Sequence, residues 1–551
     1  MNSLRKLLFS SFLLLPLLKA YSQQKDLPKG WHLLDKSASG YYGISLDKAI
    51  EFVRQKNLKS KPVVIAVIDT GIDTTHPAIK PALWKNPGEI AGNGIDDDKN
   101  GYTDDISGWN FLGSRDGNRN VEKDSDIELR IYYRFKDKWK DSVIDGSTLS
   151  PAEAENYRTW KKASEMINNS RNASMKELKY LLRSFEKCGS NDSILRIAMD
   201  RTVYTGAELT NYYPNTEEGK KARQFILNIM SQNNALSFTN VEFLHNYEAY
   251  IKNEEQKIYN NYSEPYPYRN FVTGDNYFDI NDRYYGNNNI MVSSRSALHG
   301  TYVAGIIGAA NRNEQGFRSI ADNVRIIFIK ATNDGSEHEK DIALAIKYAV
   351  ENGARIINMS FGNPLSVEKK WVDDAVKFAA ENNVLLVHAS SNSASDYDQN
   401  RYYPDPGMLD GSYAPNWITV GSSSDYSSGT LVAGFSSYGK KSIDVFAPGI
   451  KIYSTAPGNT YQSFQGSSAA AAVVSGLAAF LLQYYPKLSA VQLKHIIEKS
   501  VSIPEKPVLK PGTGEMVPFS ELCRTGGIVN AYEAIKLAAK TRPAKPAFIS
   551  R

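Results

Sequence analysis

The chain has 551 residues, which is long enough for a large core and more than one structural unit. Its 65 basic and 60 acidic residues leave a formal net charge of +5, and so slight an excess argues against a nucleic-acid partner or a strongly acidic one. The two cysteines, Cys188 and Cys523, are too few for a disulfide scaffold or a zinc cluster, and whether they pair is left open.

The start of the chain has the pattern of a secretory signal peptide. Arg5 and Lys6 precede the apolar stretch Leu7–Leu18, and residues 20–22 offer a cleavage site. A membrane anchor is the alternative, but the stretch is shorter than the about 20 residues that a spanning helix needs. We expect residues 1–22 to be removed, which leaves no stable membrane span and a protein in the periplasm or outside the cell.

Residues 23–60 form a short lead before the first strand. Ser45 is predicted to cap a helix from Leu46 to about Gln55, because serine favours that position and apolar residues recur at helical spacing after it. The residues expected on the apolar face of this helix are Ala49, Ile50 and Val53.

An almost wholly apolar run, residues 62–68, ends at Asp69. Such a run predicts a strand buried on both faces, as in a parallel α/β sheet. Open α/β sheets hold their reacting groups just beyond the carboxyl ends of the strands, so Asp69 and the Thr70-Gly71 turn are candidate site residues. Asp-Thr-Gly also opens the site of aspartic proteases, but the chain has no second copy of it.

An acidic segment after this strand resembles a calcium-binding loop. Oxygen-bearing side chains stand at positions 1, 3, 5 and 9 of the loop pattern, namely Asp96, Asp98, Asn100 and Asp104. Gly101 is at position 6, but position 12 is Ser107 where a bidentate glutamate is expected. We predict a structural calcium ion at these four residues and no organic cofactor. The alternative is an acidic surface loop turned at Asn100-Gly101.

Residues 114–283 are rich in lysine, glutamate, asparagine and tyrosine and predict an inserted, mainly helical subdomain. Ser174 and Glu177 have the spacing of a capping box, and apolar residues recur at helical spacing after them. The tyrosines could form a contact surface or could pack the helices together, and both alternatives stay open.

Strands and helices alternate over residues 61–113 and 284–540, which predicts a mostly parallel sheet covered on both faces. The expected buried strands are Val63–Asp69, Val324–Ile329, Ala354–Ser360, Val384–Ala389 and Ile418–Gly421. The expected helices span about 339–352, 367–382, 468–484 and 489–499. Residues 541–551 are a C-terminal tail.

Two later blocks supply further candidate site residues. His299 opens a His-Gly-Thr tripeptide that is followed by Val-Ala-Gly. Ser468 precedes the run Ala469–Leu482, whose 14 small or apolar residues are too few to span a membrane and predict a buried helix. The free N–H groups at the start of such a helix suit a developing oxyanion. Taken alone, Ser468 would be explained as an N-cap.

Together, the blocks around Asp69, His299 and Ser468 give the order Asp, His, Ser, and over about 300 residues the chain resembles the subtilisin-like serine peptidases, or subtilases. The resemblance covers roughly residues 45–112 and 285–540. It implies a three-layer α/β fold in which Ser468 is the nucleophile, His299 the base and Asp69 the group that orients His299.

The resemblance also implies residues around this triad. Asn392 would donate to the oxyanion together with the Ser468 N–H, although Ser391 stands where the family usually has glycine and would be strained if the turn needs a positive φ. The segment Ser360, Phe361 and Gly362 would pair with the main chain of an extended substrate.

Four positions depart from the family pattern. They are Tyr302 for a histidine, Ser467 for threonine, Ala469 for methionine and Ala472 for proline. The lead is also too short for the pro-domain that many secreted subtilases carry, which leaves the route of activation open. None of these changes removes a triad group, but Ala472 could shift the helix that carries Ser468.

The sequence therefore predicts a secreted serine endopeptidase that acts on polypeptides through an acyl-enzyme. One alternative is a catalytically silent binding protein on the same scaffold, with the tyrosine-rich insertion as its working surface. The other is an acyl-transferase or peptide ligase that uses the same triad. Substrate preference, processing sites and oligomeric state are not predicted.

Overall fold

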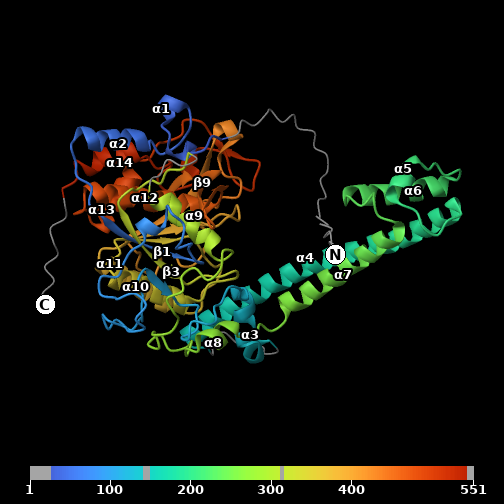
Figure 1. Ribbon diagram of the computed structural model, residues 1–551, viewed down its shortest axis with the longest axis horizontal. Helices are drawn as coiled ribbons and strands as arrows, with labels where there is room; N and C mark the ends of the chain where they lie inside the picture. Colours follow the sequence, from blue (N-terminus) through green and yellow to red (C-terminus); the bar gives the residue numbers. More distant parts are fainter. Residues whose placement is uncertain (1–26, 141–148, 311–315, 543–551) are drawn as a thin grey trace. The chain divides into compact units, whose positions relative to one another are not determined.

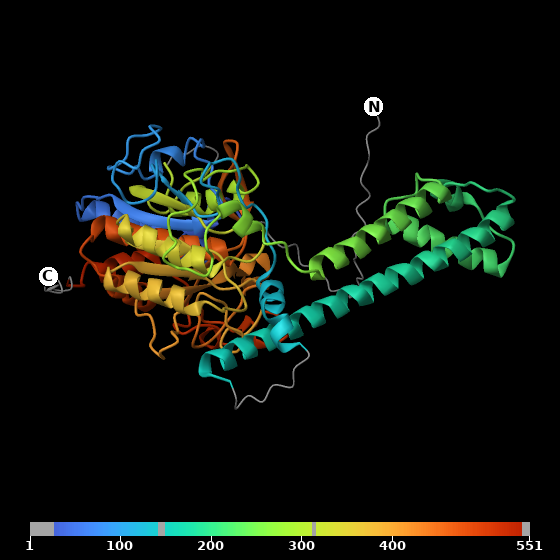
Figure 2. The same cartoon turned by 90° about the horizontal axis from the view of Figure 1, so that it is seen from below.

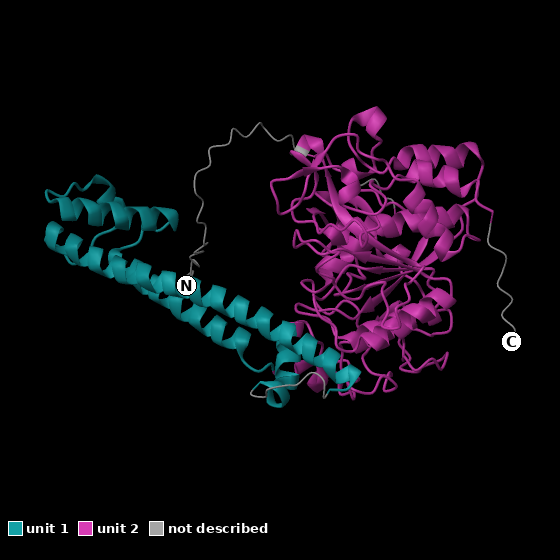
Figure 3. Ribbon diagram, turned by 180° about the vertical axis from the view of Figure 1, so that it is seen from behind, with its two compact units in different colours: residues 1–20, 128–265 teal, residues 21–127, 266–551 magenta. Residues whose placement is uncertain are grey.

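The computed structural model describes residues 27–140, 149–310 and 316–542. These residues fall into two compact units (Figure 3). Residues 128–265 form one, which we call the helical arm, and the residues up to 127 and from 266 form the other, which we call the sheet domain. Residues 114–127 and 266–283, predicted as part of the insertion, thus belong to the sheet domain, and the signal-peptide prediction lies outside the described residues.

An eight-stranded sheet runs through the sheet domain in the order β2-β3-β1-β4-β5-β6-β7, with β8 also paired to β6. Its strands are β1 Val63–Asp69, β2 Gly108–Asn110, β3 Val324–Lys330, β4 Ile356–Met359, β5 Leu385–Ala389, β6 Trp417–Asp425, β7 Thr430–Val432 and β8 Val445–Pro448. The β6–β7 pair is antiparallel and the other pairs are parallel. The predicted mostly parallel sheet is confirmed.

Helices cover both faces of this sheet (Figure 1). Ile65 and Val67 of β1 pack on one face with α2, α9, α12, α13 and α14, while Ala66 and Ile68 pack on the other with α10 and α11, because successive side chains of a strand point to opposite faces. The helices are α2 Leu46–Gln55, α9 Ala297–Ile307, α10 Glu339–Glu351, α11 Lys369–Glu381, α12 Ser467–Tyr484, α13 Ala490–Lys499 and α14 Ala531–Ala538. The three-layer α/β prediction is confirmed.

Shorter elements complete the sheet domain. They are α1 Lys36–Ser39, α8 Tyr268–Thr273, the antiparallel pair β9 Ile452–Ala456 and β10 Thr460–Phe464, the antiparallel pair β11 Val508–Leu509 and β12 Met516–Val517, and the 3₁₀ turns Trp31–Leu33, Lys80–Ala82, Tyr426–Ser428 and Phe519–Glu521. The β9–β10 hairpin leads directly into Gly466 and α12, so it fixes where that helix begins.

The helical arm is built around one long helix. Its helices are α3 Ile127–Trp139, which starts one residue before the arm, α4 Pro151–Met199, α5 Gly206–Asn211, α6 Glu217–Gln232 and α7 Asn240–Tyr262. α4 and α7 lie side by side (Figure 2) and share a hydrophobic cluster with α5 and α6 that includes Leu178, Leu195 and Phe243. Tyr204 is buried in this cluster whereas Tyr213 is exposed, so the tyrosines of the arm serve both as packing and as surface.

Of the two predicted helix caps, Ser45 holds in position but makes no side-chain cap bond, and Ser174 is wrong. α2 begins at Leu46 as predicted, but Ser45 has φ 60 and its hydroxyl donates to Asp35 Oδ2 at 2.9 Å, since a left-handed residue does not direct its side chain at the first turn. Ser174 lies inside α4, which continues through it because the apolar period extends on both sides. The capping box of α4 is formed by Ser150 and Glu153.

Both cysteines are buried free thiols, Cys188 in the arm and Cys523 in the sheet domain. Among the described residues, α12 is the one helix long and apolar enough to cross a membrane by length and composition. Of the 18 residues of α12, 94% are buried inside the protein, as expected for a core helix.

Candidate active site

Asp69 and His299 meet at the carboxyl edge of the sheet. Asp69 ends β1 and is 2% exposed, and His299 Nδ1 donates to its Oδ1 at 2.7 Å. The Thr70 N–H donates to the same oxygen at 2.8 Å. A carboxylate accepts only, so this bond places the proton of a neutral imidazole on Nδ1 and leaves Nε2 free to accept one.

The environment of His299 favours its protonated form. Burial alone would lower the pKa of the imidazole, but the charge of Asp69 and the hydrogen bond to it outweigh burial and raise the pKa above its ordinary value of 6.5. The more distant charge of Glu337 acts in the same direction. The imidazole is therefore a stronger base than free histidine, as a group that takes a hydroxyl proton should be.

Ser468 lies in the first turn of α12, after Gly466 with φ 142. Its hydroxyl is mostly buried and donates to the Ser360 carbonyl at 3.2 Å, while the Ser360 hydroxyl donates back to the Ser468 carbonyl at 3.2 Å. In the described part of the chain no hydrogen bond joins Ser468 to His299. The Ser468 hydroxyl is thus bonded to the main chain of the residue that follows β4.

Tyr302, where the family pattern has histidine, lies inside this site. It is 5% exposed, and its ring packs edge-on against His299 with centroids 4.8 Å apart and stacks on Phe464 at 4.2 Å. Burial and the charge of Asp69 raise the pKa of its phenol, and a hydrogen bond with the Ser468 side chain opposes them. The sequence flagged this position as a departure but gave no sign that it contacts the candidate nucleophile.

Asn392 lies beside the main chain of the candidate nucleophile. Its Oδ1 accepts from the Ser467 N–H at 2.9 Å, so its amide NH₂ is turned the other way. A Cβ built on Gly466 would lie 3.5 Å from Asn392 Nδ2 and 3.8 Å from the Ser468 nitrogen, so both donors border the same small space. Ser391 does not adopt a positive φ, and Ala394 does, with φ 51, so the strain considered at Ser391 does not arise.

The predicted substrate segment follows β4 and lies against the start of α12 through the Ser360–Ser468 contacts. A Cβ on Gly362 would lie 3.3 Å from the Tyr403 carbonyl and 3.4 Å from His388 Nε2. This position therefore leaves little room for a side chain, which agrees with the presence of glycine there.

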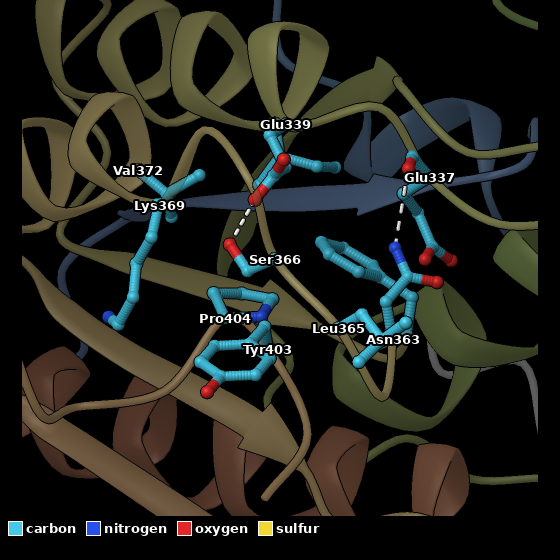
Figure 4. Close-up of a pocket in the computed structure, with 11 residues that line it drawn as sticks. Glu337, Glu339, Asn363, Leu365, Ser366, Lys369, Val372, Tyr403 and Pro404 are labelled. Atoms are coloured by element: carbon cyan, nitrogen blue, oxygen red, sulfur yellow. Dashed lines mark hydrogen bonds between the residues drawn. The ribbon is translucent and has the colours of Figure 1, made fainter. Parts of the chain in front are cut away.

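Phe361, within the predicted substrate segment, lines a pocket with room of about 20 Å³, enough for about one water molecule (Figure 4). Glu339 faces it, accepting from the Ser366 hydroxyl and from the Val367 and Glu368 N–H groups, and burial raises the pKa of its carboxyl despite these bonds. Tyr403 lies on the opposite side of the pocket. The sequence gave no indication that Glu339 lies next to the substrate segment.

The acidic loop brings together a different set of carboxylates from the one predicted. Oxygen atoms of Glu89, Asp96 and Asp98 lie within 4.8 Å of one another. Asp104 instead accepts from the Gly92 and Gly94 N–H groups, and Asn100 Oδ1 accepts from the Tyr102 N–H. Three carboxylates fit the oxygen donors that calcium prefers. Glu89 was missed because it lies outside the loop pattern.

The sequence profile of the subtilase family matches residues 60–520. The chain belongs to the subtilase family. It is 35% identical to subtilisin DY of Bacillus licheniformis over 37% of this chain and 70% of that protein. It is 34% identical to the thermophilic serine proteinase of Bacillus sp. strain AK1 over 43% of this chain and 52% of that protein. A solved cold-adapted subtilisin-like serine proteinase aligns over 41% of this chain and 74% of its own with 27% identity and a TM-score of 0.33. This subtilase is accordingly a serine-type peptidase, and its family acts on polypeptides.

Proposed function

We propose that this subtilase is a secreted serine endopeptidase that works through Asp69, His299 and Ser468. The observation that carries the proposal is the 2.7 Å hydrogen bond from His299 Nδ1 to a buried Asp69 oxygen, because it leaves Nε2 as the acceptor for a serine proton. Further support comes from Ser468, at the start of a buried helix where unpaired N–H groups favour negative charge.

In the proposed reaction, the Ser468 hydroxyl leaves the Ser360 carbonyl and attacks a peptide carbonyl while His299 Nε2 takes its proton. The Ser468 N–H and the Asn392 amide donate to the oxyanion of the tetrahedral intermediate. When that intermediate collapses, His299 gives its proton to the departing amine, and an ester to Ser468 remains. Water, deprotonated by His299, attacks this ester; the bond to the Ser468 oxygen then breaks, His299 returns the proton to that oxygen, and the carboxylic acid product leaves. Asp69 keeps its charge and stabilises the imidazolium.

Two accessory features belong to the same proposal. Residues 360–362 would form main-chain hydrogen bonds with an extended substrate. A calcium ion at Glu89, Asp96 and Asp98 would stabilise the loop that follows β1, with no organic cofactor involved. Secretion rests on the charged and apolar pattern of residues 1–22, and the destination is the periplasm or the exterior.

The first test is the intact mass of the purified protein after treatment with a fluorophosphonate, which reacts with activated serines. We expect one adduct on the wild type and none on Ser468→Ala. Ser467→Ala is the matched control, since Ser467 lies in the same turn but bonds to the Ser390 carbonyl, and it should still label. A folded, calcium-supplied wild type without an adduct would contradict the proposal and favour a silent binding protein. Transfer of the acyl group to added amines in preference to water would favour a ligase.

A further inference from the structure

Lys330 is a buried lysine next to the Asp69–His299 pair. It ends β3 and is 0% exposed, and its ammonium donates to the Thr70 carbonyl at 2.8 Å and the Thr332 carbonyl at 3.1 Å. Both acceptors are neutral main-chain groups. Burying a full positive charge against neutral carbonyls alone is costly, and a negative charge nearby would stabilise the ammonium.

Asp69, in turn, is a buried acid with one oxygen atom that lacks a hydrogen-bond partner among the described residues. Its Oδ1 takes the bonds from His299 and Thr70, whereas its Oδ2 is buried without a hydrogen-bond partner among the described residues. The resting imidazole is neutral and supplies a hydrogen bond but no charge. A buried carboxylate stays ionised only where an opposite charge or strong hydrogen bonds compensate it.

The sheet places these two groups together. Asp69 of β1 and Lys330 of β3 are register partners in a parallel pair, and their side chains extend from the same face because Val67 and Phe328, two residues before each, both pack there. Thr70, whose carbonyl binds the ammonium, is the residue after Asp69.

We propose that Lys330 is the resident counter-charge of Asp69 and so acts, as a positioning residue, on the Asp69–His299 pair. The inference rests on the proposed function in that it assigns His299 the role of base. Lys330 would balance the negative charge of Asp69 while the imidazole is neutral, and would limit how tightly the pair holds an added proton.

The charges around the pair allow this assignment. Burial lowers the pKa of Lys330 to about 8, and the negative charges of Glu122 and Asp69 oppose that fall, so the side chain is largely protonated at neutral pH. Asp69 and Glu337 are the charges that act on His299, and both are negative. Glu122 lies in the loop before the arm, where its carboxylate accepts from the Ser293 hydroxyl. Lys330 is thus a positive charge set against Glu122 and Asp69, the two acids that act on it.

The test removes the charge in two ways. Lys330→Met keeps the apolar stem, and Lys330→Gln also keeps donors for the two carbonyls. In both, the pair should hold its proton to higher pH, so the acid limb of the fluorophosphonate labelling rate should move up by about one pH unit. Lys494→Met is the control: Lys494 is also buried and donates to a main-chain carbonyl, that of Trp417, but it lies on α13, where it faces Asp444 and Glu498. Its profile should match the wild type.

A second measurement needs neither a Lys330 variant nor peptidase activity. Asp69→Asn should lower the pKa of Lys330, because the negative charge of Asp69 opposes the fall that burial causes. The probe is NMR of protein labelled with ¹³Cε-lysine, with the Lys330 signal assigned and followed against pH. An unchanged Lys330 pKa in Asp69→Asn, or an unmoved acid limb in a folded Lys330 variant, overturns the inference. If Ser468 does not label at all, the proposed function fails. The NMR result still decides whether Lys330 is the counter-charge of Asp69.

Discussion

At the scale of single residues, the candidate site depends on which atom of each side chain is already occupied. Asp69 Oδ1 receives the His299 bond, and Asn392 Oδ1 receives the Ser467 N–H. In the proposed mechanism, the remaining atoms, Nε2 of the imidazole and Nδ2 of the amide, are the ones that act on the substrate. Such preorganised donors and acceptors cost no reorganisation when charge develops, which is why small truncations here should have large kinetic effects.

Replacing Asn392 by alanine should lower kcat by on the order of 10²–10³ with little change in KM, because one donor to the oxyanion is lost while substrate contacts remain. The measurement is steady-state cleavage of a fluorogenic casein. Ser393→Ala, one residue away on the same exposed turn, is the control and should keep normal kcat. A raised KM with unchanged kcat in Asn392→Ala would instead indicate a role in substrate binding.

The raised pKa of His299 fixes the direction of the pH dependence. The base must be neutral, so kcat/KM should rise as pH passes through a value above 6.5 and level off beyond it. Because the folded state binds this proton more tightly than the unfolded chain, the stabilisation from this group is full below pH 6.5 and is lost as pH rises through the raised pKa. A pH–rate profile with its acid limb at or below 6.5 would contradict the role of Asp69.

At the scale of elements, the bounds of a strand or helix were best predicted from sequence where burial alone determined the residue pattern. β1 matches its predicted bounds because a strand buried on both faces is apolar throughout. α2 does begin at Leu46, but the Ser45 side chain does not cap it, and no helix begins at Ser174, since a capping motif is a local pattern that the chain can override. The contacts of Tyr302 could not be predicted, because they depend on how α9 and the β9–β10 hairpin meet.

Tyr302 joins these two elements through its stack on Phe464, and this contact can be tested. Tyr302→Ala should lower the free energy of unfolding by about 3 kcal/mol, because it empties a buried aromatic site, whereas Tyr302→Phe keeps the ring and should cost about 1 kcal/mol or less. Urea denaturation of the sheet domain, followed by tryptophan fluorescence, measures both. Equal losses in the two variants would mean that the hydroxyl, and not the stack, carries the stability.

At the scale of the whole molecule, the chain consists of two units with separate hydrophobic clusters. The cluster of the arm is drawn from α4 to α7, and those of the sheet domain from the two faces of its sheet. The acidic loop belongs to the sheet domain, because Glu89, Asp96 and Asp98 all precede residue 128. A ligand that binds this loop should therefore stabilise one unit and not the other.

Removal of calcium tests this separation. If the ion binds the folded loop, a free concentration about 100 times its Kd should stabilise the sheet domain by about 2.7 kcal/mol, and a chelator should abolish the gain. Calorimetry with calcium or with EGTA should show one transition that moves and one, from the arm, that does not. Glu89→Gln with Asp96→Asn should remove the calcium shift, whereas Asp97→Asn, which alters a neighbouring acid outside the group, should keep it. A calcium shift that survives in the double variant would place the ion elsewhere.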